Sequence, residues 1–153
     1  MIGLLQRVSS ASVEIAGCRV AEINHGLLVL IAVQQGDEIA QAERLLERLL
    51  NYRVFPDDQG RMNCSLKETR GGLLLVPQFT LAADTKKGNR ASFTHAAEPA
   101  HGERLFTWLC ENARACWHAT ECGEFGADMQ VKLCNDGPVT FWLEVAPKAS
   151  TTG

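Results

Sequence analysis

The sequence lacks any long hydrophobic run, because no stretch approaches the roughly 18 apolar residues that a membrane span needs. Arg7 also falls too early for the hydrophobic region of a secretory signal. We therefore expect a cytoplasmic protein with no membrane partner. Positive charge is not in excess either, since the formal net charge is −3. This value argues against binding nucleic acid by bulk electrostatics, so any RNA contact must be local.

Paired cysteine motifs are absent as well, since no C-x-x-C occurs among the six cysteines. Without an export signal, scattered cysteines favour reduced, mostly buried thiols over a disulfide framework. One cluster could suggest zinc, but its spacing matches none of the usual ligand pairs; its members are Cys110, Cys116, His118 and Cys122. We expect no metal and no other cofactor.

Familiar catalytic signatures are missing too. There is no G-x-S-x-G motif, no P-loop and no G-x-G-x-x-G fingerprint. No histidine lies near an acid in a recognisable triad motif, and no spacing of acids suggests a carboxylate pair. Residue types alone therefore indicate no side-chain catalyst.

The hydrophobic patterning predicts two main helices among many short strands. Helices are predicted from an N-cap at Asp37 to Asn51 and from Pro99 to about Ala115. A hairpin is predicted around Ala16-Gly17. The predicted strands cover 2–8, 12–15, 18–23, 27–33, 53–55, 73–76, 129–133 and 139–145.

Because these elements do not alternate regularly, they predict an α+β fold with mostly antiparallel or mixed sheets. The length of 153 residues fits a single compact domain. We place this domain at residues 1–145 and expect residues 146–153 to be a disordered C-terminal tail.

A candidate site follows the apolar run 73–76, which reads as a strand buried on both faces. Gln78, Phe79 and Thr80 come directly after this run, and a basic loop with Lys86, Lys87 and Arg90 follows. A rigid strand that delivers polar groups to a basic loop is a common way to build a site. The alternative is a core strand that ends in an ordinary solvated turn.

Three segments of the sequence together resemble the bacterial D-aminoacyl-tRNA deacylase (D-Tyr-tRNA deacylase) family, and the similarity extends from Met1 to about Val145. They are Leu5-Gln6-Arg7-Val8, Gln78-Phe79-Thr80-Leu81 and Asn135-Asp136-Gly137-Pro138-Val139-Thr140. The resemblance implies a compact, barrel-like, sheet-rich fold. It also implies an enzyme that hydrolyses the ester between a D-amino acid and the 3′-terminal adenosine of tRNA.

The resemblance further implies a homodimer with active sites at the subunit interface. A cis Gly137-Pro138 peptide would enter the partner subunit's pocket, hold the substrate ammonium with two carbonyls and exclude L side chains. Glycine has no side chain to exclude, so glycyl-tRNA mischarged on tRNA(Ala) is also expected as a substrate.

Residue roles are carried over position by position. The resemblance assigns catalysis to Gln78, Phe79 and Thr80, and it implies that Arg7 braces the Gly-Pro segment with Met129 packed beside it. Pro77 stands where the family usually has serine, which removes a hydroxyl and a backbone N–H. The basic residues Lys86, Lys87 and Arg90 are the expected tRNA contacts.

Two mechanisms remain open at this point. Thr80 could be the nucleophile, although the motif supplies no adjacent base. Alternatively, the 2′-hydroxyl of the adenosine assists while backbone N–H groups near Phe79 and Thr80 stabilise the oxyanion. A non-catalytic nucleic-acid-binding module that uses the same pocket is the competing function.

Overall fold

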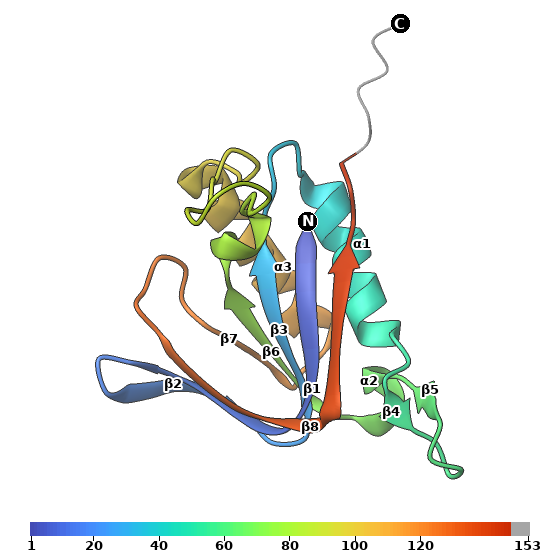
Figure 1. Ribbon diagram of the computed structural model, residues 1–153. Coiled ribbons are helices and arrows are strands. Elements are labelled where there is room, and N and C mark those ends of the chain that lie inside the picture. Colours follow the sequence, from blue (N-terminus) through green and yellow to red (C-terminus); the bar gives the residue numbers. More distant parts are fainter. Residues whose placement is uncertain (148–153) are drawn as a thin grey trace, which may run out of the picture.

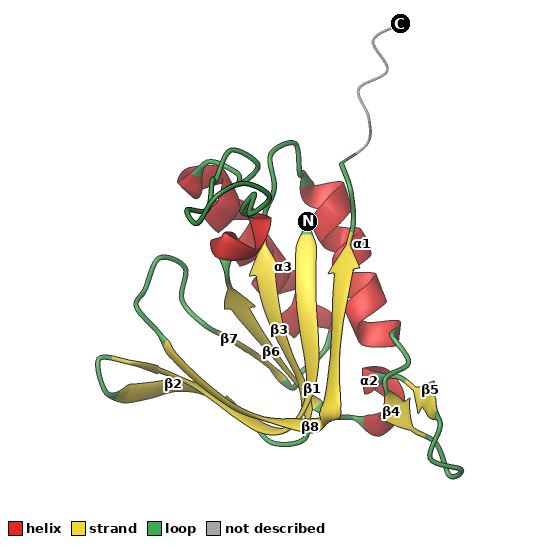
Figure 2. Cartoon of the chain, in the orientation of Figure 1, coloured by secondary structure: helices red, strands yellow, loops and turns green. Residues whose placement is uncertain are grey.

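A mixed six-stranded sheet organises the chain in the computed structural model, which describes residues 1–147 (Figures 1 and 2). Its strands run in the order β2 (Cys18–Ile23), β1 (Ile2–Ile15), β3 (Gly26–Ala32), β6 (Gly72–Pro77) and β7 (Thr120–Cys122), and β8 (Gln130–Glu144) pairs with β1. The remaining elements are α1 (Ile39–Asn51), α2 (Leu66–Thr69), the 3₁₀ turn η1 (Phe79–Ala82), α3 (Pro99–Cys116), and the hairpin of β4 (Phe55–Pro56) with β5 (Met62–Cys64).

The sheet curls until it is nearly closed. Strand β1 pairs antiparallel with β2, β3 and β8, whereas β6 runs parallel to both β3 and β7. The end strand β2 also approaches β6 and β7, so the two ends of the strand order come together. The predicted α+β class with a mixed, barrel-like sheet and two main helices is confirmed.

Strand β1 is longer than predicted because its two halves serve different partners. Its first half, from Ile2 to Val8, pairs with β3, and its second half, from Ala11 to Ile15, pairs with β2. The predicted strands 2–8 and 12–15 are therefore one element. The predicted hairpin around Ala16-Gly17 joins it to β2.

The core lies on both faces of this sheet. On one face, α1 and α3 pack against alternate residues of the strands, including Leu5, Val29 and Leu75. The residues of opposite parity, such as Val8, Leu28 and Leu74, fill the inside of the curve. This arrangement explains why 73–76 is a continuous apolar run: all four side chains are buried, as predicted.

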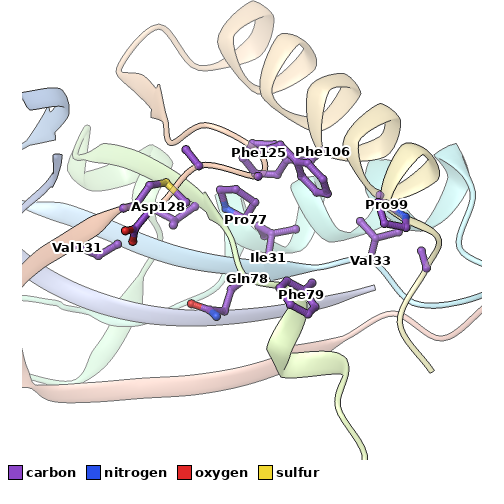
Figure 3. A pocket seen from close by; sticks show the side chains of 16 residues that line it. Ile31, Val33, Pro77, Gln78, Phe79, Pro99, Phe106, Phe125, Asp128 and Val131 are labelled. Carbon is purple, nitrogen blue, oxygen red and sulfur yellow. The ribbon is translucent and has the colours of Figure 1, made fainter. Parts of the chain in front are cut away.

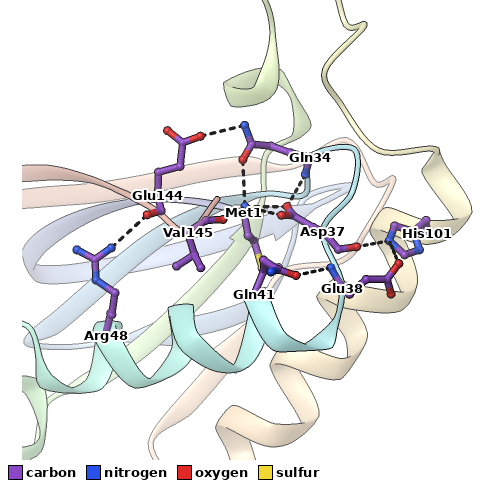
Figure 4. Close-up of polar contacts among 9 residues, drawn as sticks. All are labelled: Met1, Gln34, Asp37, Glu38, Gln41, Arg48, His101, Glu144 and Val145. Atoms are coloured by element: carbon purple, nitrogen blue, oxygen red, sulfur yellow. Dashed lines mark hydrogen bonds and ion pairs between the residues drawn. The ribbon is translucent and has the colours of Figure 1, made fainter. Parts of the chain in front are cut away.

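The start of α1 differs from the prediction that Asp37 is its N-cap. The N-cap is Glu38, whose N–H donates to Gln41 Oε1 at 2.8 Å. Asp37 is instead fully buried, with its carboxylate 2.8 Å from the Met1 ammonium (Figure 4). Burial lowers the pKa of this ammonium, and the hydrogen bond with Asp37 opposes the shift. The sequence could not show this because the two charged groups meet only in the folded chain.

The six cysteines are free, but only Cys110 is buried. The expectation of mostly buried thiols is therefore wrong, because Cys18, Cys116 and Cys134 lie on strand or helix positions that face outward. Among residues 1–147, no helix is both long enough and apolar enough to cross a membrane. Of the expected tail at residues 146–153, the structure describes residues 146 and 147, and positions 148–153 lie outside the described residues.

Candidate active site

Strand β6 carries the candidate catalytic segment to the end of the sheet. Strand β6 lies between β3 and β7 in the sheet. The first residues of β3 and β6, Gly26 and Gly72, lie so close together that Gly26 has no room for a side chain. A Cβ on Gly26 would lie 2.0 Å from the Gly72 carbonyl oxygen. After the strand ends, the Gln78 N–H donates to the Ile31 carbonyl at 2.7 Å, and η1 begins at Phe79. The fold thus fixes the position of the Gln78–Thr80 segment.

A mostly apolar pocket of about 470 Å³ opens beside this segment (Figure 3). Strands β3, β6 and β8, helix α3 and the loop before β8 all contribute to its walls. Its lining residues are Ile31, Val33, Val76, Pro77, Gln78, Phe79, Ala97, Pro99, Gly102, Phe106, Phe125, Gly126, Ala127, Asp128, Met129 and Val131. The volume and the mostly apolar lining are typical of a site for a small organic group.

Two backbone donors lie where the chain leaves the pocket, since Phe79 lines the pocket and Thr80 follows it. The N–H groups of Phe79 and Thr80 begin the 3₁₀ turn, and neither has a hydrogen-bond acceptor within residues 1–147. The first bond of the turn runs from the Leu81 N–H to the Gln78 carbonyl at 3.2 Å. Two adjacent free N–H groups can stabilise a developing oxyanion.

The Thr80 hydroxyl is exposed and accepts a hydrogen bond from the Gln78 side-chain amide. Within the described residues, no His, Lys, Asp or Glu side chain is hydrogen-bonded to it. A hydroxyl needs an adjacent base to act as a nucleophile at neutral pH. Among the described residues, the Thr80 hydroxyl therefore has a polar neighbour, Gln78, but no base that could activate it.

The basic loop is anchored close to the same segment. Asp84 and Ser92 exchange two backbone hydrogen bonds, at 2.7 and 3.0 Å, which close the loop at its base. Just beyond this bridge, the ring of Phe93 contacts that of Phe79, with centroids 5.2 Å apart. The three cations Lys86, Lys87 and Arg90 are exposed on this loop.

The Gly137-Pro138 peptide is cis and lies in an irregular part of β8. Gln6 pairs with Thr140 and Val8 with Asn135, so four residues of β8, 136–139, oppose the single residue Arg7. Gly137 and Pro138 are both exposed in this bulge.

Arg7 lies beneath the bulge and is mostly buried, with 12% of its side chain exposed. Its Nε donates to the Asp136 carbonyl at 3.0 Å, and its Nη1 donates to the Val54 carbonyl at 2.7 Å. A further bond, from the Val139 N–H to Asn135 Oδ1 at 3.0 Å, spans the bulge. These contacts are what a bracing role for Arg7 requires, and the role itself stays a prediction.

The structure does not bring all predicted residues together in one chain. Pro77, Gln78, Phe79 and Met129 line the pocket, whereas the Gly137-Pro138 segment and Arg7 do not. Met129 lies against Gly123, where an added Cβ would be 3.0 Å from its sulfur. Its expected packing beside the Gly-Pro segment stays a prediction.

Sequence reasoning missed the wall of the pocket that α3 and the following loop provide. Gly102 lies inside α3 facing Phe125, whose ring would be 3.4 Å from an added Cβ. A glycine inside a predicted helix was the available signal. The remaining wall residues could not be assigned, because the loop that carries them has no periodic pattern.

A pair of thiols lies behind this wall. Cys110 of α3 and Cys122 of β7 share a hydrogen bond, which raises the pKa of the Cys110 thiol and lowers that of Cys122. Among residues 1–147, no group of three or more His, Cys, Asp and Glu side chains is arranged to hold a metal ion.

Comparisons with known proteins point to one family. The family model described as D-Tyr-tRNA(Tyr) deacylase matches residues 4–144. A D-aminoacyl-tRNA deacylase of Alkalilimnicola ehrlichii is 61% identical over 98% of this chain and 100% of its own length. One from Thioalkalivibrio sulfidiphilus is 62% identical, over 96% of this chain and 99% of its own.

Two solved structures share the fold. The c-Myc DNA unwinding element binding protein superposes with a TM-score of 0.91 at 34% identity, covering 95% of this chain and 99% of that one. A probable eukaryotic D-amino acid tRNA deacylase gives a TM-score of 0.83 at 17% identity, covering 94% and 98%.

The family match and the two relatives define a class, that of hydrolases acting on aminoacyl-tRNA. Within that class, the chain belongs to the D-Tyr-tRNA(Tyr) deacylase family, as the resemblance of its motifs predicted.

Proposed function

We propose that this protein hydrolyses the ester of D-aminoacyl-tRNA and releases the free D-amino acid and tRNA. The observation that supports the proposal is the segment Gln78–Thr80: it carries two N–H groups without an acceptor in residues 1–147 and lies beside a mostly apolar pocket of about 470 Å³. Relatives about 60% identical over nearly the whole chain bear the name of this activity.

The proposed reaction uses the backbone and the substrate itself. Water attacks the ester carbonyl carbon, and the Phe79 and Thr80 N–H groups stabilise the oxyanion that forms. The ester bond to the adenosine 3′-oxygen then breaks, and the neighbouring 2′-hydroxyl gives its proton to this leaving oxygen while it takes up the proton that the attacking water releases. This route is supported by the lack of a base at Thr80 among the described residues.

Chirality is read by a second copy of the chain in this proposal. Gly137 and Pro138 are exposed and do not line the pocket of their own chain, and Arg7 holds the backbone on their N-terminal side. Inserted into a partner's pocket, their carbonyls accept hydrogen bonds from the substrate ammonium. An L side chain would then point into the Gly-Pro backbone, whereas a D side chain points outward. Glycine has no side chain to reject, so glycyl-tRNA mischarged on tRNA(Ala) is a proposed substrate.

The basic loop supplies the local RNA contact that a chain of net charge −3 needs. Lys86, Lys87 and Arg90 are exposed and anchored to the catalytic segment through the ring contact of Phe93 with Phe79. In the proposed complex, these cations face tRNA phosphates close to the pocket.

A non-catalytic nucleic-acid-binding role is the second candidate, and one observation favours it. The c-Myc DNA unwinding element binding protein, whose name describes DNA binding, shares 34% identity and the same fold over 95% of this chain. A protein of that kind would bind nucleic acid with the same pocket and without turnover.

The two candidates separate in one set of assays with D-Tyr-tRNA, glycyl-tRNA(Ala) and a D-Tyr-tRNA that ends in 2′-deoxyadenosine. The proposal expects turnover of the first two and near-inertness of the third. Binding of all three without release of amino acid would support the second candidate. Normal turnover of the 2′-deoxy substrate would instead remove the 2′-hydroxyl from the mechanism.

A further inference from the structure

Two exposed phenylalanine rings stand together at the rim of the pocket. Phe79 is 56% exposed and Phe93 is 45% exposed, although neither ring has a polar atom that would benefit from water. Their centroids lie 5.2 Å apart with a 54° angle between the rings, so they form one continuous aromatic surface. An apolar surface of this kind, built from two separate segments, is typical of a contact site.

The aromatic surface extends outward from the pocket. Phe79 lines the pocket, whereas Phe93 does not, so the aromatic surface starts at the pocket and leads away from it. Both rings are held by backbone structure: Phe79 begins η1, and Phe93 follows the Asp84–Ser92 bridge. A ligand that extends out of the pocket on this side would pass over Phe93.

The charge beside the rings is positive. The loop from Thr85 to Ala97 contains Lys86, Lys87 and Arg90 and no carboxylate. Two acids flank this loop in the sequence, Asp84 and Glu98. Asp84 is engaged in the loop itself, because its Oδ1 accepts the Lys86 N–H at 3.0 Å. Aromatic rings beside exposed cations are the combination with which proteins bind single-stranded nucleic acid, since bases stack on the rings while phosphates meet the cations.

We infer that Phe93, together with the outer face of Phe79, is a stacking platform for the unpaired bases that precede the terminal adenosine of tRNA. The inference rests on the proposed function, which assigns the terminal adenosine to the pocket. It adds a binding residue outside the pocket and a reason for the exposure of two apolar rings. The bases on the platform are the cytidines of the single-stranded 3′ end.

Binding of a short RNA tests this inference without any need for turnover. The probe is a 5′-fluorescent single-stranded RNA that ends in CCA, and a second probe carries abasic sites in place of the two cytidines. Fluorescence anisotropy gives Kd for the wild type and for Phe93→Ala, Phe93→Leu and Phe93→Tyr. Met62→Ala is the matched control, because Met62 is as exposed as Phe93, at 45%, but lies on β5 far from the loop (Figure 1).

The platform predicts that Phe93→Ala binds the CCA probe about 5- to 100-fold more weakly, the range expected for losing one base–aromatic stack. Phe93→Leu keeps an apolar side chain without a ring and should lose nearly as much, whereas Phe93→Tyr keeps the ring and should bind like the wild type. The abasic probe should bind the wild type weakly, and Phe93→Ala should then weaken it no further. Met62→Ala should change neither Kd.

Three results would overturn the platform: unchanged binding of the CCA probe by Phe93→Ala, an equal loss with the abasic probe, or dissociation of a dimer by Phe93→Ala in sedimentation. The last would mean that a second copy of this chain covers Phe93. Failure of the proposed function gives a different result, since a wild type that binds the CCA probe through Phe93 but never deacylates D-Tyr-tRNA would refute the deacylase role alone.

Discussion

At the scale of single residues, Thr80 distinguishes two mechanisms: attack on the ester by its hydroxyl, or stabilisation of the oxyanion by its backbone N–H. Among the described residues, its hydroxyl is hydrogen-bonded to the Gln78 amide and to no base, and its N–H at the start of η1 has no acceptor. Thr80→Ala should therefore reduce kcat for D-Tyr-tRNA by well under the ~10²–10³-fold typical of deleting an oxyanion donor, because the backbone N–H remains. Single-turnover kinetics with Thr80→Ser as the control provides the test, and an inactive Thr80→Ala enzyme beside an active Thr80→Ser enzyme would make the hydroxyl the nucleophile.

Gly137 provides the second prediction at this scale. Its φ of +132° disfavours any side chain, and an added Cβ would lie 2.7 Å from Val139 Cγ2 and 3.0 Å from Arg7 Nη2. Gly137→Ala should therefore displace the bulge, lowering the rate on D-Tyr-tRNA and the ratio of D to L turnover together. Gly60→Ala is the control, since Gly60 has a φ of +76° but open space around it. An unchanged D-to-L ratio in Gly137→Ala would separate the bulge from chiral selection.

At the scale of elements, the buried ion pair between Met1 and Asp37 joins the start of β1 to the turn before α1. The ammonium also donates to the Val145 carbonyl at 2.6 Å, so the last strand is tied to the same point (Figure 4). Both charged groups have no exposed side-chain area. Removing one of them would leave the other charged and unpaired in the interior.

Asp37→Asn should accordingly lower the free energy of unfolding by ~3–5 kcal/mol. Urea unfolding followed by circular dichroism measures this change. Glu47→Gln is the matched control, because Glu47 pairs with Arg44 at 2.7 Å on the surface, with both side chains more than half exposed. That pair should contribute about 0–1 kcal/mol. Equal, small losses in both variants would show that the buried pair adds no more than a surface pair.

The same elements show how far a sequence alone can lead. Strand β6 was predictable because four consecutive buried side chains leave a direct mark in the sequence. The N-cap of α1 was not predictable, because the Asp37 side chain is hydrogen-bonded to the Met1 ammonium, 36 residues away in the sequence. The residues Asn135–Pro138 were read as a break between two strands, yet pairing with β1 on both sides makes β8 one strand with a bulge.

The candidate site divides in the same way. The segment Gln78–Thr80 and its basic loop are contiguous in sequence, so their pattern and their resemblance to a family could be read directly. The opposite wall, with Gly102 and Phe125, is formed by tertiary packing of α3 against the loop after β7. No spacing rule links those positions to Gln78, and only the fold brings them together.

At the scale of the whole molecule, the single chain lacks part of its proposed site. The Gly137-Pro138 segment does not line the pocket of its own chain. Within residues 1–147, β8 pairs only with β1 and exposes the large apolar side chains of Leu133 and Trp142. An exposed edge strand with apolar side chains is a surface that a second chain can cover. We predict a homodimer, so sedimentation at micromolar concentration should give twice the chain mass of 16.7 kDa. An active enzyme that sediments as a monomer would contradict this prediction.

Our central proposal is that this protein removes D-amino acids from tRNA and spares L-amino acids. The most direct measurement is the rate of deacylation of D-Tyr-tRNA and of L-Tyr-tRNA by the purified protein, each corrected for spontaneous hydrolysis. The account predicts rapid release of D-tyrosine and release of L-tyrosine at the spontaneous rate. Equal rates for the two substrates, or no release of D-tyrosine above the spontaneous rate, would contradict it.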